Sequence, residues 1–192
     1  MKQLHLYGAK GGVGTTTVAL LTGLALEREG HHTLVVDRTG GTDLWVGAGV
    51  PRPAEDLEAP HKVTERLSFV SEVVPAAHQG FDAIVYDHGT VPPSSEDFGA
   101  RVLVTTCCYL ALRRAPVIDF RPDGVAVVVE PNRAITTKDV ANVLGQMVVA
   151  EFQWDPAVAR AIDGGLLLAR MPRGAKQSAE KLLASVPTGV AA

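Results

Sequence analysis

The chain has 192 residues, of which 46% are hydrophobic and 20% charged, a balance typical of a globular protein with one sizeable core. Its net charge is −3, so the overall charge does not predict binding to nucleic acid. No apolar run reaches the ~18 residues that a membrane-spanning helix needs, and the first residues lack the apolar stretch of a signal peptide. We therefore expect a cytoplasmic protein.

Apolar runs typical of strands alternate with segments whose apolar residues have helical spacing. Strands are predicted at residues 3–7, 33–36, 67–70, 83–86, 102–106, 125–129 and 147–150. Helices are predicted at residues 15–29, 109–118, 137–144, 156–163 and 175–184. The stretches 49–61 and 91–97 are predicted to be surface loops. This alternation favours a single α/β domain, residues 1–192, with a mostly parallel twisted sheet flanked by helices on both faces.

Residues 8–17, which read GAKGGVGTTT, follow the first predicted strand directly. They match the phosphate-binding pattern G-x-x-x-x-G-K-[ST] at Gly8, Gly14 and Thr16, but Thr15 stands where the lysine belongs. A glycine-rich turn between a strand and a helix presents successive backbone N–H groups, which form a concave site for an anion. The predicted phosphate-binding residues are Gly11, Gly12, Val13, Gly14, Thr15, Thr16 and Thr17.

Two aspartates end predicted strands, where ligands of parallel sheets bind. Asp87 ends the strand AIVYD and fits a Walker B carboxylate, which acts on Mg²⁺ or its water shell. Thr16 is placed to ligate Mg²⁺ through its hydroxyl group. Asp37 ends the second strand. The alternative interpretation is a glycine-rich turn with a capping threonine and no ligand.

The sequence resembles the deviant Walker A ATPases of the ParA/MinD group, which segregate plasmids and chromosomes and position division sites and other cargo. The resemblance rests on GAKGGVGTTT, LVVDRTGGTDL, FDAIVYDHG and RVLVTTCCYLALRRA, and it continues through GVAVVVEPNR to WDPAVARAIDGG. It implies a P-loop NTPase fold that binds Mg-ATP and forms a face-to-face homodimer around two nucleotides. It also implies that Lys10 reaches the partner's phosphates, that Asp37 is catalytic, and that Asn132 and Arg133 contact the base.

Two departures from the family pattern affect catalysis. Thr15 replaces the P-loop lysine, and losing a charge-assisted contact to phosphate costs about 1.5–3 kcal/mol. Thr39 replaces the second acid of the D-x-D that follows the second strand, and Asp43 is nearby but out of register. We therefore predict very slow or absent hydrolysis.

These observations leave two main functions open. The first is an ATP-dependent dimer that positions DNA or a protein assembly, together with a centromere-binding or cargo-adaptor protein. The second is a nucleotide-independent pseudo-ATPase scaffold similar to the TadZ/CpaE-type proteins, some of whose relatives have loops like this one. A synthetase of the same superfamily is disfavoured, because no replacement base or cation is evident in the sequence.

Surface features bear on the partners. Arg170, Arg173, Lys176 and Lys181 are candidates for nonspecific contacts to DNA, although a solvated helix face interrupted by Glu180 is the alternative. The last ten residues lack a basic amphipathic helix, so no membrane anchor is predicted.

The remaining candidate ligands give no metal signal. Cys107 and Cys108 are adjacent rather than spaced, which predicts two buried, inert thiols in a reduced chain. His31 and His32 have no acidic or cysteine partner at ligand spacing. We therefore expect no metal other than Mg²⁺.

Overall fold

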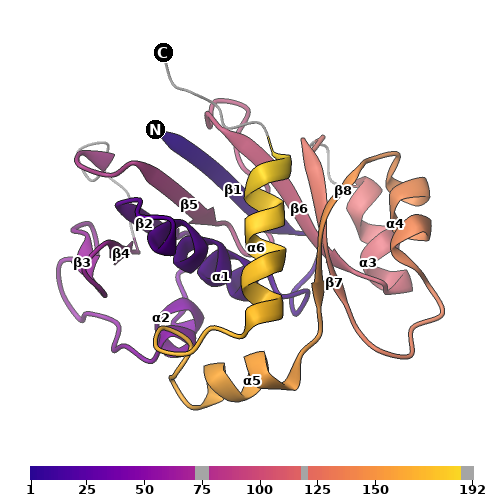
Figure 1. Ribbon diagram of the computed structural model, residues 1–192. Helices are drawn as coiled ribbons and strands as arrows, with labels where there is room; N and C mark the ends of the chain where they lie inside the picture. The colour runs from indigo at the N-terminus through magenta and orange to yellow at the C-terminus, as the bar shows by residue number, and fades with distance from the viewer. Residues whose placement is uncertain (72–77, 118–120, 187–192) are drawn as a thin grey trace.

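The computed structural model describes residues 1–71, 78–117 and 121–186. These residues form an eight-stranded sheet with the strand order β3-β4-β2-β5-β1-β6-β7-β8 (Figure 1). All neighbouring strands are parallel except β3, which pairs antiparallel with β4. The mostly parallel sheet predicted from the alternating pattern is therefore confirmed.

The elements alternate along the chain. The strands are β1 Lys2–Gly8, β2 Thr33–Asp37, β3 His61–Lys62, β4 Leu67–Val70, β5 Ala83–Asp87, β6 Ala100–Thr106, β7 Gly124–Val129 and β8 Val148–Gln153. The helices are α1 Thr15–Arg28, α2 Asp43–Ala48, α3 Tyr109–Arg114, α4 Thr137–Leu144, α5 Pro156–Asp163 and α6 Arg173–Ser185. A 3-10 turn, Ala115–Val117, continues α3.

Helices cover both faces of the sheet, and alternate residues of β7 show how. Ala126 belongs to the core that packs against α1 and α6, whereas Val125 and Val127 pack with Leu112 of α3 and Val140 of α4. Figure 1 shows α1 and α6 side by side in front of the strands, with α3 and α4 beyond β7. Near-continuous apolar strands are what burial on two faces requires.

Two short elements were not predicted. Helix α2 has six residues, too few for helical spacing to show, and β3 has only two. The last strand extends to Gln153 rather than Ala150. Because β8 is an edge strand, it tolerates the charged and partly exposed Glu151. The predicted helix 109–118 ends at Arg114 before the 3-10 turn, and Ile118 lies outside the described residues.

Within the described ranges, none of the helices has the length and apolar character that crossing a membrane demands. The prediction that the last ten residues form no membrane anchor falls partly outside the described ranges, because α6 ends at Ser185 and residues 187–192 are not described.

Candidate functional site

The glycine-rich loop connects the central strand β1 to α1. Gly12 and Gly14 have φ values of 75° and 92°, in the left-handed region that favours glycine. A Cβ added to Gly8 would lie 2.6 Å from Cγ2 of Val13, whose side chain is buried beneath the loop. The loop therefore closes tightly around Val13, and Gly8, Gly12 and Gly14 are required by conformation or by space.

The first turn of α1 is left open for an anion. Gly14 is the N-cap residue, and no side chain caps the helix by a hydrogen bond. The free N–H groups of a first helical turn carry partial positive charge, which is reinforced by the helix dipole. Thr15, Thr16 and Thr17 all line the cavity in front of this helix end.

Asp37 and Asp87 lie side by side at the carboxyl ends of β2 and β5, where they are register partners. Both are fully buried. Oδ1 of Asp37 accepts hydrogen bonds from the Thr39 amide at 2.9 Å and the Thr39 hydroxyl at 2.6 Å, and Oδ1 of Asp87 accepts one from the Gly89 amide at 3.0 Å. Among the described residues, Oδ2 of each aspartate is buried without a hydrogen-bond partner.

Electrostatics at this pair favour a cation. Burial raises the pKa of Asp87; the Thr16 hydroxyl and the Gly89 amide oppose this, while the charges of Asp37 and Asp43 add to it. The pair offers two neighbouring carboxylates, each with one oxygen that has no partner among the described residues, and the Thr16 hydroxyl is nearby. Mg²⁺ prefers such a set of oxygen donors. The residues present therefore fit a magnesium ion.

A cavity of about 460 Å³ lies over the loop and the first turn of α1. Its lining combines polar and apolar groups, and the polar side chains include Lys10, Thr39, Asp43 and His88. The Lys10 ammonium group donates to the carbonyl oxygen of Gly11 at 3.0 Å, so in the single chain it folds back onto its own loop. Asp43, out of register in the sequence, is brought to the cavity by the short helix α2.

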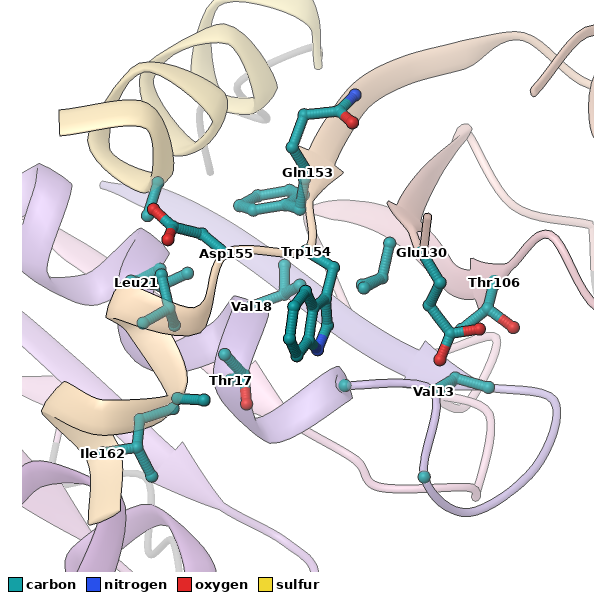
Figure 2. A pocket seen from close by; sticks show the side chains of 17 residues that line it. Val13, Thr17, Val18, Leu21, Thr106, Glu130, Gln153, Trp154, Asp155 and Ile162 are labelled. Atoms are coloured by element: carbon teal, nitrogen blue, oxygen red, sulfur yellow. The ribbon is translucent and has the colours of Figure 1, made fainter. Parts of the chain in front are cut away.

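A second cavity of about 250 Å³ lies on the other side of the loop (Figure 2). Most of its lining is apolar, from α1, α5 and β8, and its polar wall includes Thr106, Glu130 and Gln153. Figure 2 shows the Trp154 indole between the side chains of Thr17 and Glu130. Both cavities are lined by Gly12, Gly14 and Thr17, so the larger, more polar cavity and the smaller, more apolar one adjoin at the loop.

The two residues expected to contact a base lie outside this arrangement. Asn132 and Arg133 are exposed in the turn after β7 and line neither cavity. The Arg133 guanidinium forms an ion pair with Glu130, with Nε donating to Oε2 at 2.7 Å. A direct role of these residues at a base stays a prediction, and the structure instead places Trp154 and Glu130 at the cavity.

Arg38 was missed by the sequence interpretation because it occupies the variable position between Asp37 and Thr39. It lines the larger cavity. Its Nη1 donates to the two oxygens of Asp97 at 3.4 and 3.3 Å, and its guanidinium carbon lies 4.8 Å from the ring centre of Tyr86. The positively charged Arg38 side chain is thus held in the cavity wall by the Asp97 carboxylate and the Tyr86 ring.

The two cysteines differ from each other. Cys107 is buried as predicted, and burial raises the pKa of its thiol. Cys108 is only half-buried at the start of α3, where the amides of Ala111 and Leu110 lower its thiol pKa. The prediction of two buried thiols is therefore wrong for Cys108, because it lies half-buried at the N-cap of α3.

The basic residues near the C-terminus lie before and along α6. Arg170, Arg173 and Lys181 are exposed, and Lys176 pairs with Glu180 at 3.4 Å. A pair on the helix surface lowers the net positive charge of this face. Whether it contacts DNA stays a prediction.

Comparison with protein families gives one match. The family model described as "Cellulose biosynthesis protein BcsQ" matches residues 1–47, which contain β1, the loop, α1 and β2. No curated protein sequence matches the chain.

Several solved structures share the fold over nearly their whole length. A ParA family ATPase from Chlorobium tepidum TLS matches with a TM-score of 0.76 and 18% identity, covering 93% of this chain and 96% of that one. The MinC:MinD cell division complex of Aquifex aeolicus gives 0.74 and 17%, with coverages of 95% and 94%. MinD complexed with Mg-ADP from Pyrococcus horikoshii OT3 gives 0.71 and 18%, with coverages of 94% and 93%. The chain therefore has the fold of the ParA and MinD ATPases.

Proposed function

We propose that this chain is a ParA-like protein that binds Mg-ATP, dimerises with it, and partitions or positions a cargo. The observation that carries the proposal is the buried pair Asp37 and Asp87, whose Oδ2 atoms have no hydrogen-bond partner among the described residues and which lie near the open N-terminus of α1. Burying unpartnered carboxylate oxygens costs stability unless a cation compensates them. A scaffold that binds nothing would have no reason to keep this arrangement.

The two adjoining cavities fit the two ends of a nucleotide. The amides of residues 11–17 and the N-terminus of α1 would hold the phosphates in the polar cavity, and the base would lie against Trp154 in the apolar one. The MinD structure with Mg-ADP has the same fold, which supports this class of ligand.

Thr16 and Asp87, with Asp37 behind them, are the residues that would hold Mg²⁺. The ion, when bound, supplies positive charge that offsets the charge of the phosphates. Asp87 keeps its Oδ1 bonded to the Gly89 amide, which leaves Oδ2 for the ion or its water shell.

Hydrolysis is proposed to be weak or absent. Thr39, at the position of the second acid, donates its hydroxyl proton to Asp37 at 2.6 Å. A hydroxyl group that already donates to a carboxylate cannot take a proton from water as a carboxylate does. Thr15 supplies no cation, so the transferring phosphate also lacks its usual charge partner in cis.

Lys10 is proposed to supply the missing charge in trans. Its ammonium group donates one hydrogen bond to a neutral carbonyl of its own loop, a contact weaker than a charge-assisted one to a phosphate of the partner subunit. In this proposal the dimer is stabilised by nucleotide, because each Lys10 completes the other subunit's site.

The cargo side is the least specified part of the proposal. A protein partner of the centromere-binding or cargo-adaptor type is expected, and the MinD chain of Aquifex aeolicus is seen in complex with MinC. Nonspecific DNA contacts would involve Arg170, Arg173 and Lys176. We place this activity in the cytoplasm and treat residues 1–192 as one domain.

Sedimentation velocity with no nucleotide, Mg-ADP or Mg-ATP tests the proposal. The chain should become a dimer only with Mg-ATP, and Lys10→Ala should stay monomeric while the control Lys62→Ala, an exposed lysine of β3, still dimerises. A mass that does not respond to nucleotide would favour the TadZ/CpaE-like scaffold instead. A dimer that forms unchanged in Lys10→Ala would refute the role of Lys10.

A further inference from the structure

A second group of potential metal ligands lies next to Asp87 in the sequence and the fold, where His88 follows it directly. His5 comes from the central strand β1, His88 directly follows β5, and Asp97 precedes β6. One ligand atom from each lies within 4.8 Å of the other two. The side chains of His5 and His88 are almost fully buried, with exposures of 1% and 4%.

The hydrogen bonds of His5 fix which of its nitrogens carries the proton. Its Nε2 lies 2.8 Å from the carbonyl oxygen of Phe98, which can only accept, so Nε2 is the donor. Nδ1 of the neutral ring therefore holds a lone pair, and it points at Nε2 of His88, 2.9 Å away. A histidine whose second nitrogen donates to a carbonyl is oriented as metal-bound histidines are.

Further contacts hold the His5 ring and the Asp97 carboxylate in place. The His5 ring stacks on Tyr86 with 4.2 Å between ring centres and 3° between planes. Asp97 accepts a hydrogen bond from the Ser94 amide at 2.8 Å and pairs with Arg38. A carboxylate has further lone pairs beyond these contacts. Three potential ligands are thus preoriented on a strand and on both ends of one loop.

The chemistry of the group suits a transition metal rather than magnesium. Two imidazole nitrogens and one carboxylate are typical ligands of Zn²⁺ and similar ions. The 2.9 Å between the two nitrogens is close to the ~3.3 Å expected around a tetrahedral zinc.

We propose that His5, His88 and Asp97 bind one zinc ion that ties the segment 88–97 to the central strand β1. On binding, the proton that His88 donates to His5 moves from Nε2 to Nδ1 of His88, and zinc takes the two facing lone pairs, so nothing is oxidised or reduced. Three protein ligands leave one position for water. Because His88 also lines the phosphate cavity and follows Asp87, the ion would fix the wall beside the proposed nucleotide site.

Equilibrium dialysis of chelator-treated, tag-free protein against Zn²⁺ or Co²⁺ tests the site. Excess Mg²⁺ and the absence of nucleotide keep the oxygen-only pair Asp37 and Asp87 from contributing. One equivalent of metal is expected for the unmodified chain, with visible Co²⁺ absorption of nitrogen- and oxygen-bound ions. His88→Gln and Asp97→Asn should lose it, and His32→Gln, at an exposed histidine, should keep it.

Thermal unfolding separates loss of the site from loss of the fold. Zn²⁺ should raise the Tm of the unmodified chain and of His32→Gln, and should leave the Tm of Asp97→Asn unchanged. No bound metal in the unmodified chain would show that His5 and His88 form only a hydrogen-bonded pair and would overturn the proposal. Full binding by both His88→Gln and Asp97→Asn would overturn it as well.

Discussion

Thr15 is the residue on which nucleotide affinity is expected to depend most. It lines the phosphate cavity at the position where the P-loop pattern has lysine, and its side chain carries no charge. The loop around it keeps the backbone amides and the open helix end, which would hold phosphate without lysine in the proposed function. Affinity is therefore expected to be reduced rather than abolished.

Restoring the charge should restore the affinity. Thr15→Lys is expected to tighten Mg-ATP binding by roughly 10- to 100-fold, because a charge-assisted contact to phosphate contributes about 1.5–3 kcal/mol. Calorimetry of this variant beside Thr15→Met, which has similar length but no charge, isolates the charge. Equal affinities for the two variants would show that position 15 does not face the phosphates.

Cys108 provides a second prediction for a single residue, with a dependence on pH. The helix amides that lower its thiol pKa increase the thiolate fraction at neutral pH, whereas burial of Cys107 does the opposite. Alkylation by iodoacetamide should therefore label Cys108 first. The alkylation rate of Cys108 should reach its plateau at a lower pH than the rate of an ordinary thiol does. Mass spectrometry of Cys108→Ser, which should lose the fast phase, checks the assignment; equally fast labelling of Cys107 would contradict it.

At the scale of elements, helix α2 begins at Asp43, and its other end makes a close contact between Gly49 and Gly165. Gly49 closes α2 with φ of 74°, and a Cβ there would collide with the backbone of Gly165 after α5. Gly145 closes α4 with φ of 58°, but a Cβ there would meet no atom within 4 Å. Gly49 and Gly145 thus share a left-handed backbone conformation, but only Gly49 lies against the backbone of another segment.

Alanine at these two positions separates strain from collision. Gly145→Ala should cost roughly 1–2 kcal/mol of unfolding free energy through the left-handed backbone alone. Gly49→Ala should cost a further ~1–3 kcal/mol, because the backbone around Gly165 must shift. Urea unfolding of both variants measures the difference, and equal losses would mean that the α2–α5 contact is loose.

The regular elements were largely predictable because each carries a local signal. Strands buried on both faces, such as Ala83–Asp87, appear as short apolar runs. Helix α4 begins with a capping box formed by Thr136 and Asp139, and its predicted bounds were confirmed. Helix α2 carries no comparable signal, because six residues make fewer than two turns.

At the scale of the whole molecule, the strand order decides which residues meet. The loop and the two aspartates were predictable, since the pattern around Gly8 is local and strand ends gather at one edge. The apolar cavity was not, because it combines Glu130 after β7 with Trp154 after β8. The cluster of His5, His88 and Asp97 was equally hidden, since 83 residues separate the two histidines.

Calorimetric titration with Mg-ATP tests the central claim, that a P-loop without its lysine still binds nucleotide. We expect micromolar affinity, with the heat of binding strongly reduced in Asp87→Asn and unchanged in the control Asp163→Asn, an exposed residue at the end of α5. Absence of binding at millimolar Mg-ATP in correctly folded protein would contradict the claim, and would leave the fold as a scaffold that acts without nucleotide.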